Sequence, residues 1–581
     1  MALAFRTTLA LVLIATIAVA ISHRIDGRPG VVTVYADRTV GVVRPIWDEV
    51  NLWKLLATFG VHRPDPAEMW GGEGWLRRAA PWLRYARVVA PLGGNYAPEI
   101  AEACDHRQES EGHVPNWECG QGGHPGVAAV NESMRWVDGE WVVDYSPFRT
   151  SLQRLLRSGV RPHLNLSATP VAFTGGTGDF RHYHWNAKPP EDLEGWLDYV
   201  RDAFASVEDL DRTGWRVSII NEPNCLIPDE NGDIQHVGFA SNPDGYASTW
   251  TAAARTVSEI APEVVVHPGN YVTSDTFEGE DNLQLYLASL GAELEAAPDL
   301  SWEGLPYIGM SLYEVPDTTL EDFRATRIRR LIRAQTDNGL AKRPIKIDEL
   351  GLHVNVRRPF EAEADQPLRT TRFAGSWFAE AQRSFIDAGD VVSSAPWLKA
   401  IVQMPSLKPL PAGHVYGMLG LLAGQLETSS ESGEPIALRT SGHEDGLPRL
   451  ATRVGPGPGL RPESTLRAIA TGTGEGIVRI FVVHHQPTPL KDGDPRQEEL
   501  AREVRVEVAG LPAGSYSLRH ASIGGRGGAV WNGEEVSPLL WHVDGCVTST
   551  GERVRAPDAL HMPANSVWLF EIEPRAECQR A

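Results

Sequence analysis

The stretch Trp215–Asn224, WRVSIINEPN, decides the fold of this 581-residue chain. Its apolar and β-branched residues indicate a buried strand, which ends in Asn221, Glu222 and a proline. The stretch Ile345–Gly351, IKIDELG, repeats the arrangement with two adjacent acidic residues, the second of which is Glu349. Because the carboxyl ends of the strands in a parallel barrel meet at one face, these two stretches would bring two glutamates to the same face.

Strand-like and helix-like segments alternate on both sides of these stretches, from about residue 45 to residue 426. We therefore predict an α/β fold, a (β/α)₈ TIM barrel, over residues 31–427. The two glutamates then end strands four and seven, which lie across the barrel mouth from each other. Eight short and mostly apolar runs, typical of strands buried on both faces, are the candidate strands: Pro45–Asn51, Tyr85–Leu92, Arg161–Leu166, Trp215–Ile220, Val264–Pro268, Tyr307–Tyr313, Ile345–Glu349 and Leu398–Met404.

The character of the sequence changes after about Glu427. Helical periodicity disappears, and turn-rich segments separate short runs such as Val504–Val508, where valines alternate with charged residues. This pattern predicts a β-sandwich accessory domain over residues 428–575. Val31–Val43 also has strand character and is a candidate for joining that domain in space.

The N-terminal segment, residues 1–22, has the layout of an export signal. Arg6 precedes the apolar run Leu9–Ile21, which ends in the small residues Ala18-Val19-Ala20. The run is shorter than the roughly 20 residues of a membrane-spanning helix. We expect a secreted or periplasmic protein, or alternatively one that this segment anchors in a membrane with the folded part outside the cytoplasm.

The charge balance narrows the classes of partner. Lys and Arg number 54 against 75 Asp and Glu, which gives a formal net charge of −21. A nucleic-acid partner would need a basic surface, so we expect no nucleic acid. An anionic chain has no general attraction for anionic lipids, which leaves the N-terminal segment as the membrane-binding candidate. The oligomeric state stays open.

Two glutamates that face each other suit the cleavage of glycosides. A retaining glycosidase needs two carboxyl groups about 5–5.5 Å apart, one protonated to act as acid and one ionised to act as nucleophile. We therefore predict a hydrolase that cleaves O-glycosidic bonds of poly- or oligosaccharides by double displacement, with a carbohydrate as its partner. Both charge roles are filled by carboxyl groups, so we expect no cofactor and no metal.

The chain resembles glycoside hydrolase family 39 of clan A, which includes β-xylosidases and α-L-iduronidases, over roughly Val31 to Pro574. The motifs that carry the resemblance are INEPN at 220–224, IDELG at 347–351, DYSPFRTSLQRLLRSGVRPHLNL at 144–166, PPEDLEGWLDYVRDAF at 189–204 and VYGMLGLLAGQL at 415–426. The resemblance implies an exo-acting, β-xylosidase-like enzyme. An α-L-iduronidase-like or exopolysaccharide-degrading glycosidase is the alternative, and a non-catalytic carbohydrate-binding protein is a third interpretation.

The resemblance also implies roles for individual residues. Glu222 matches the family's acid/base, Glu349 its nucleophile, and Asn221 the residue that binds the 2-hydroxyl of the sugar. Tyr313 ends strand six, where the clan often holds a tyrosine that orients the nucleophile. Because side chains alternate along a strand, we expect only one of Asp348 and Glu349 to point into the barrel mouth.

Three positions depart from the clan's pattern. No histidine follows Arg87 in strand two, Ser311 stands where a histidine is common in strand six, and the predicted strand eight, Leu398–Met404, contains no tryptophan. These positions shape the sugar subsite, so the identity of the sugar is left open. Tyr183 and Trp185, after strand three, are predicted substrate contacts, with ordinary packing as the alternative.

Overall fold

The structure is a computed structural model. It describes residues 30–576, with gaps at 55–64, 90, 93–132, 138–139, 167–168, 174–188, 225–226, 229–233, 236–238, 240–241, 273–279, 315–319, 353–367, 404–405, 429–434, 438–445, 455–464, 488, 491, 525–527, 530–538 and 556–558. The predicted export segment, residues 1–22, lies outside the described residues. Within the described residues, no helix combines the length and the hydropathy that crossing a membrane requires.

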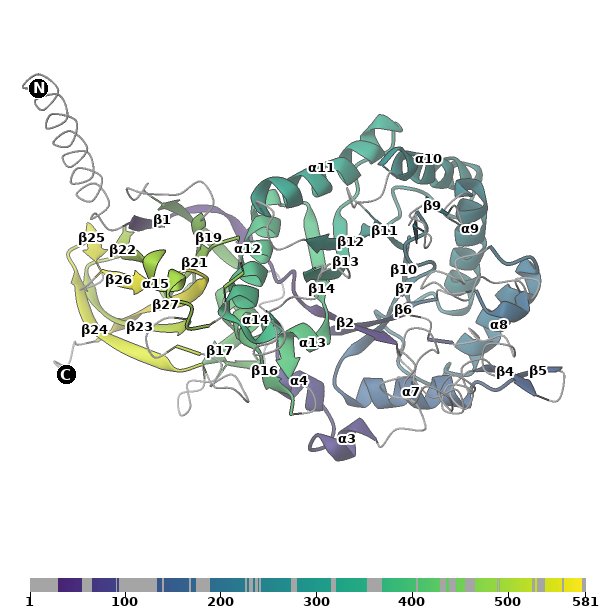
Figure 1. The fold of residues 1–581 in the computed structure, drawn as a ribbon, viewed down its shortest axis with the longest axis horizontal. Coiled ribbons are helices and arrows are strands. Elements are labelled where there is room, and N and C mark those ends of the chain that lie inside the picture. The colour runs from purple at the N-terminus through teal and green to yellow at the C-terminus, as the bar shows by residue number, and fades with distance from the viewer. Residues whose placement is uncertain are drawn as a thin grey trace, which may run out of the picture.

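The α/β part contains two parallel sheets, which occupy one end of the molecule in Figure 1. The first has the order β10-β7-β6-β3-β2 and the second the order β11-β12-β13-β14, and every pairing in both is parallel. The strands are β2 (Glu49–Lys54), β3 (Tyr85–Val89), β6 (Arg161–Asn165), β7 (Arg216–Ser218), β10 (Val265–His267), β11 (Asn270–Val272), β12 (Ile308–Glu314), β13 (Ile345–Leu352) and β14 (Val391–Pro396).

The two sheets are joined at both of their seams. At one seam β10 and β11 are separated by two residues, so the chain itself passes from the first sheet to the second. At the other seam Asn51 forms a parallel bridge with Trp397, and the backbone N–H of Ser394 donates to the carbonyl of Ile46 at 2.6 Å. Counted with β10 and β11 as one position, eight strand positions follow one another in the order expected of a (β/α)₈ barrel.

Helices follow most of these strands and lie on their outer side (Figure 1). In α7, Pro147 occupies the first turn, where its missing N–H costs nothing, and Phe148, Leu152 and Leu155 form the buried stripe. The long helices are α7 (Ser146–Arg157), α8 (Leu193–Ala205), α9 (Pro243–Ile260), α10 (Glu280–Ala296), α11 (Leu320–Asp337), α12 (Arg372–Ala388) and α14 (Pro411–Leu422), and the short ones are α3 (Pro66–Met69), α4 (Trp75–Ala79), α13 (Leu398–Ile401) and α15 (Arg496–Glu499).

The prediction of strand eight was wrong. The eighth strand is β14, Val391–Pro396, whereas the predicted segment forms helix α13 and the short strand β15 (Val402–Gln403). The sequence VVSSAP misled the prediction because its centre is polar. Those serines are nevertheless buried, and the hydroxyl of Ser394 donates to the carbonyl of Ile46 at 3.1 Å.

The C-terminal part is one ten-stranded sheet in the order β24-β23-β27-β21-β20-β19-β1-β22-β25, with β26 paired to β22. Val506 of β22 and Leu518 of β23, near opposite ends of this order, belong to one buried cluster, so the sheet curls around a core of its own. Its strands are β1 (Gly30–Val43), β19 (Leu447–Val454), β20 (Thr465–Gly472), β21 (Val478–His485), β22 (Arg502–Ala509), β23 (Gly514–Ile523), β24 (Trp541–Ser549), β25 (Arg553–Arg555), β26 (Leu560–Met562) and β27 (Ser566–Arg575).

Strand β1 belongs to this C-terminal sheet although it precedes the α/β part in sequence. It pairs antiparallel with β19 and parallel with β22. The two parts also share a core, because Phe481 and Leu569 of the sheet lie in the same buried cluster as Trp377 of α12 and Tyr416 of α14. The guanidinium of Arg479 adds a hydrogen bond of 2.7 Å to a carbonyl of α14.

Short antiparallel ladders lie outside the main sheets: β4 (Met134–Val137) with β5 (Glu140–Val143), β8 (Ile227–Pro228) with β9 (Ile234–Gln235), β15 with β16 (Lys408–Pro409), and β17 (Leu426–Thr428) with β18 (Pro435–Ala437).

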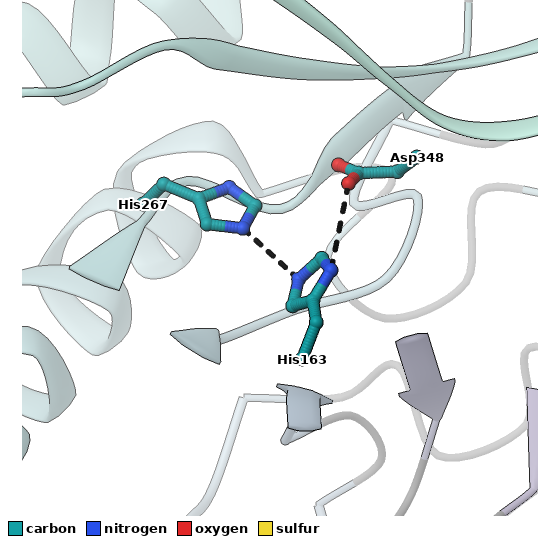
Figure 2. Close-up of side chains that lie close together, drawn as sticks. All are labelled: His163, His267 and Asp348. Carbon is teal, nitrogen blue, oxygen red and sulfur yellow. Dashed lines mark hydrogen bonds and ion pairs between the residues drawn. The ribbon is translucent and has the colours of Figure 1, made fainter. Parts of the chain in front are cut away.

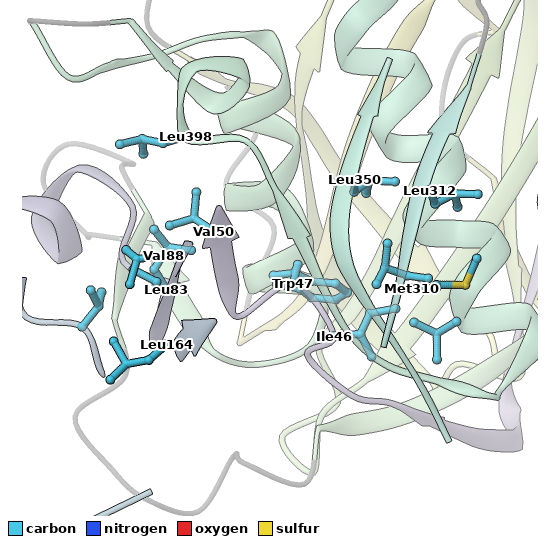
Figure 3. Close-up of a cluster of buried hydrophobic side chains, with 14 of the residues drawn as sticks. Ile46, Trp47, Val50, Leu83, Val88, Leu164, Met310, Leu312, Leu350 and Leu398 are labelled. Atoms are coloured by element: carbon cyan, nitrogen blue, oxygen red, sulfur yellow. The ribbon is translucent and has the colours of Figure 1, made fainter. Parts of the chain in front are cut away.

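The strands of the α/β part have one apolar face and one polar face. Val88 and Leu164 lie in the buried apolar cluster (Figure 3). Arg87 and His163, one position before them, pair with each other in the β3–β6 ladder and are fully buried. Because side chains alternate along a strand, these polar residues point to the opposite side, into the space that the strands enclose. That polar interior holds the candidate site.

Candidate active site

Glu222 follows β7 in an unusual backbone conformation. Its φ is +46°, in the left-handed region, although it is not glycine and a proline follows it, which normally favours extended backbone. Such strain persists where surrounding contacts hold the chain, and it concentrates at functional sites. Here the side-chain amide of Asn224 exchanges hydrogen bonds of 3.0 and 2.9 Å with the backbone of Val272 in β11.

The segment between β10 and β11 passes close to the backbone that precedes Glu222. A Cβ atom on Gly269, between β10 and β11, would lie 1.5 Å from the carbonyl oxygen of Ile220. Glycine is therefore required where the seam of the two sheets passes the segment that carries Asn221 and Glu222. Both of these side chains are buried, with 5% and 8% of their surface exposed.

Glu349, in β13, is held by two donors. Nη1 of Arg87 lies 2.7 Å from its Oε1, and the hydroxyl of Tyr313 donates to its Oε2. Arg87 is itself fixed, because its Nη2 donates to Oδ1 of Asn221 at 2.6 Å and to Oδ1 of Asn270 at 2.9 Å. One guanidinium from β3 thus ties Glu349 to the amide that precedes Glu222.

The environment of Tyr313 keeps its phenol protonated, so that it can donate a hydrogen bond. Burial raises the pKa of its phenol well above the ordinary value, and the nearby charges of Glu349 and Glu222 raise it further. The indole Nε1 of Trp397 donates to the phenol oxygen at 3.2 Å. Gly351 leaves room for this pair, since a Cβ atom there would lie 3.1 Å from the ring of Tyr313 and 3.3 Å from that of Trp397.

Glu222 has the opposite electrostatic environment. Burial, and then the negative charge of Glu349, raise the pKa of Glu222 to about 8. A hydrogen bond from Ser311 and the positive charge of Arg87 lower it only in part. The hydroxyl of Ser311 accepts a hydrogen bond of 2.6 Å from Nδ2 of Asn270, which leaves its own proton for Glu222. At neutral pH Glu222 therefore carries a proton.

A β-bulge explains how Glu349 comes to face this site. In the β12–β13 ladder Met310 pairs with Ile347 and Ser311 pairs with Glu349, so Asp348 is an extra residue without a partner position. Glu349 reaches Arg87 on β3, which is not a ladder neighbour of β13, and can do so only through the interior. Asp348 also lies in the interior, where it contacts Lys346 and His163. The alternation on which the prediction for Asp348 and Glu349 rested does not hold here, because a bulge lets both acids enter the interior.

A second group of charged side chains lies beside the site. We call it the internal ion cluster, and define it as Glu49, His163, Arg216, His267, Lys346 and Asp348. Arg216 is the only member with an exposed fraction above zero. Nζ of Lys346 donates to Asp348, to Oε1 of Glu49 at 2.9 Å, and lies 3.2 Å from Nδ1 of His163. Since Glu49 is on β2 and His163 on β6, Lys346 of β13 also spans the interior.

Three members of the cluster have the donor set of a metal site. His163, His267 and Asp348 each present a ligand atom within 4.8 Å of the others, and Nε2 of His163 lies 3.0 Å from Nε2 of His267 (Figure 2). The ammonium of Lys346, however, is already within hydrogen-bonding distance of both Asp348 and His163. It supplies the positive charge that a metal ion would supply, so the described geometry is that of an ion-pair network.

The structure brings together four of the residues singled out from the sequence: Asn221, Glu222, Tyr313 and Glu349. Tyr183 and Trp185 lie outside the described residues. No sequence pattern pointed to Asn270, and the error in strand eight hid Trp397, which directly follows the real strand. A tryptophan therefore does follow strand eight of this chain.

The chain was compared with protein-family models, curated proteins and solved structures. No protein-family model matches the sequence, and no curated protein matches it. Among solved structures, the chain is similar to a family 39 glycoside hydrolase from Xanthomonas axonopodis pv. citri, with 13% identity, 94% of this chain and 98% of that chain covered, and a TM-score of 0.57. It is also similar to a monomeric β-xylosidase from Caulobacter crescentus CB15, with 14% identity, 94% of this chain and 100% of that chain covered, and a TM-score of 0.56. A third similar structure is a bacterial orthologue of human α-L-iduronidase, with 13% identity, 95% of this chain and 85% of that chain covered, and a TM-score of 0.58.

These similarities extend over both parts of the chain and concern its fold. The resemblance to family 39 that the sequence motifs suggested is thus matched by the solved structures of that family, at low identity.

Proposed function

We propose that this chain is a retaining glycoside hydrolase with a (β/α)₈ barrel up to about residue 427 and a β-sandwich accessory domain from residue 428. The observation that carries the proposal is the contrast between two buried glutamates, one that keeps a proton and one that a guanidinium and a phenol hold in place. Glu222 is protonated because burial and Glu349 raise its pKa to about 8. Glu349 is positioned as the anion by the guanidinium of Arg87 and the phenol of Tyr313.

The two carboxyl groups divide the first step between them. Glu349 attacks the anomeric carbon and forms a covalent glycosyl ester, while Glu222 transfers its proton to the departing glycosidic oxygen. The C–O bond to the leaving group breaks with its electron pair, and the leaving group departs as a neutral alcohol. Hydrogen bonds from Arg87 and Tyr313 hold the carboxylate of Glu349 in place before the attack.

The second step reverses these roles. The ionised Glu222 removes a proton from water, the water oxygen attacks the anomeric carbon, and the ester bond to Glu349 breaks. Two inversions give a product with retained configuration. We assign Asn221, which Arg87 holds by a hydrogen bond, to binding the 2-hydroxyl of the sugar.

For the substrate we propose a poly- or oligosaccharide cleaved from its end, in the manner of a β-xylosidase. Two of the structurally similar proteins are named as a β-xylosidase and an α-L-iduronidase orthologue, which supports these two substrate classes in that order. Ser311 is smaller than the histidine common at its position, so it leaves more space beside Glu222. An exopolysaccharide-degrading activity belongs to the same proposal as its alternative.

We also propose that the protein acts outside the cytoplasm, with residues 1–22 as a cleaved signal or as a membrane anchor. Besides the layout of that segment, Cys546 is disulfide-bonded, which is typical of oxidising compartments. N-terminal sequencing of the native protein decides the point. A start just after Ala20 supports secretion or a periplasmic location, whereas an intact Met1 in a membrane fraction supports the anchor.

A panel of aryl glycosides tests the proposed activity. It should include xyloside, arabinofuranoside, glucoside, galactoside, fucoside and iduronide, each assayed with the wild type and with Glu349→Gln. We expect turnover of at least one donor by the wild type only, and NMR of the first product should show retained configuration. Binding of sugars without turnover of any donor would instead identify a carbohydrate-binding protein, and an inverted product would contradict the double displacement.

A further inference from the structure

The internal ion cluster has no role in the chemistry proposed above, yet one of its members is adjacent to Glu349 in the sequence. Burying charged groups is costly, and an apolar replacement of a buried ion pair is often as stable. Stability alone therefore does not explain why Lys346 and Asp348 lie with their charges fully buried inside the strands. Their position in β13 offers a reason.

The bulge of β13 depends on where Asp348 is held. Lys346 and Asp348 are two residues apart, so they share one face of the strand, and that face is the interior. A regular strand would direct Glu349 to the other face, toward the surrounding helices. The extra residue turns Glu349 back inward, where it meets Arg87 and Tyr313.

The neighbouring strand leaves room for the carboxylate of Asp348. A Cβ atom on Gly309 of β12 would lie 2.1 Å from Oδ2 of Asp348 and 3.2 Å from Cα of Asn270. This glycine is needed for space, and any larger residue would push the carboxylate away. Within the described part of the chain Oδ2 has no hydrogen-bond partner, and Asp348 is held through Oδ1, to which Lys346 donates and from which Nδ1 of His163 lies 3.9 Å away.

We propose that Asp348, clamped by Lys346 and accommodated by Gly309, is the positioning residue for Glu349. The clamp fixes the bulge, and the bulge sets the direction of the carboxylate that attacks the sugar. The inference rests on the proposed role of Glu349 as nucleophile. Asp348 itself touches neither substrate nor reacting atoms, and acts only through the backbone that it shares with Glu349.

The test measures how fast Glu349 attacks. A 2-deoxy-2-fluoro glycosyl fluoride of the preferred sugar forms a slow-clearing ester on the nucleophile, and intact mass followed by peptide mapping gives its rate and location. We expect Asp348→Asn to slow labelling of Glu349 and to lower kcat by ten- to a hundredfold with little change in KM, because a misplaced reacting group can cost about 10²-fold. Added azide should not restore the rate, and the product should remain retained.

Glu49→Gln is the matched control. It removes the other carboxylate that Lys346 contacts but leaves Asp348, Gly309 and the bulge in place. It should lower the melting temperature and change the labelling rate by no more than a few fold. Gly309→Ala keeps every charged group, so it tests the bulge even where Asp348→Asn folds poorly. It should slow labelling as Asp348→Asn does.

The outcomes separate this inference from the proposed function. If the wild type is labelled at Glu349, and folded Asp348→Asn or Gly309→Ala is labelled at the same rate, the positioning role is wrong while the nucleophile stands. If Glu49→Gln slows labelling as much as they do, the cluster as a whole supports the site and Asp348 has no special part. If the wild type is labelled at another residue, the proposed function itself fails.

Discussion

Two buried glutamates in the same interior, Glu49 and Glu222, have opposite electrostatics. Burial alone raises the pKa of both. For Glu49 the charges of Lys346 and Arg216 outweigh burial, with His163 beside them, and hold the pKa well below its ordinary value. For Glu222 the largest charge effect comes from the negative Glu349, and burial together with this charge raises the pKa to about 8.

The difference lies in how the cations are distributed. Lys346 and Arg216 both contact Glu49 directly. Arg87 contacts Glu349 instead, and Glu222 receives a hydrogen bond from the hydroxyl of Ser311. A carboxylate whose charge is neutralised by cations, such as Glu49, stays ionised and contributes to the structure. A carboxyl group in which burial and a neighbouring negative charge dominate, such as Glu222, can hold a proton at neutral pH and donate it. The comparison teaches that the location of function in this interior follows from where the cations lie relative to each carboxyl group.

Glu349→Ala should have the largest effect. Removing a nucleophile typically costs roughly 10⁴–10⁶-fold in kcat. Azide should restore part of the turnover by entering the vacated space, with an azido product of inverted configuration. The control is Asp348→Ala, whose loss azide should not repair. Azide rescue of Asp348→Ala alone would move the nucleophile to the neighbouring residue.

Glu49→Gln should lower stability rather than activity. It leaves Lys346 and Arg216 with an unbalanced charge in the interior, and breaking a buried pair typically costs about 3–5 kcal/mol. Urea denaturation gives the free energy of unfolding, and kcat should stay within a few fold of the wild type. Because the pKa of Glu49 is lowered in the folded protein, its contribution is present above about pH 4.5 and is lost as the pH falls through the depressed value. A variant of unchanged stability would mean that the cluster is not balanced as described.

Glu222→Gln should raise stability at and above neutral pH. In the folded protein Glu222 keeps its proton up to about pH 8, whereas in the unfolded chain it loses it near its ordinary value of 4.5. The folded state thus binds more protons in this window, and the wild type loses stability as the pH rises through it. The gain in melting temperature of the variant should grow from pH 5 to pH 8. A constant difference across that range would show that the pKa is not raised.

Ser311→Ala should have the smallest effect, a change in pH dependence. The general acid must be protonated, so kcat/KM of the wild type should fall as the pH rises through about 8. The hydrogen bond of Ser311 favours the ionised form of Glu222. Loss of this hydrogen bond should raise the pKa of Glu222 and shift the alkaline side of the kcat/KM–pH profile to higher pH by about one unit. The reason is that a hydrogen bond to a charged group is worth about 1.5 kcal/mol or more. A limb that moves downward would contradict the direction of this hydrogen bond.

Much of this molecule could be predicted from local patterns. Seven of the eight strand positions overlap the predicted runs, because buried parallel strands are short and apolar. The motif around Asn221 and Glu222 placed one carboxylate correctly at a strand end. The eighth strand was missed because the serines at its centre are polar in sequence and buried only through partners far along the chain.

The arrangement of charge could not be predicted in the same way. The bulge at Asp348 depends on Gly309 and Lys346, and no local rule of alternation reveals it. Arg87 appeared in the sequence as one arginine of strand two, yet it joins Glu349 of β13, Asn270 of β11 and Asn221 after β7. These contacts exist only once the strands enclose a common interior.

The most direct test of the central claim is the dependence of kcat/KM on the pKa of the leaving group, measured for the wild type and for Glu222→Gln, with Glu49→Gln as the control for an equal change in a buried glutamate. A general acid contributes typically 10²–10⁴-fold where the leaving group needs its proton. We predict a much steeper dependence for Glu222→Gln, near-normal glycosylation with activated nitrophenyl donors, and accumulation of the ester on Glu349 because the base for the second step is missing. Equal slopes for Glu222→Gln and the wild type, with the same loss for every donor, would contradict the assignment of Glu222 as the acid.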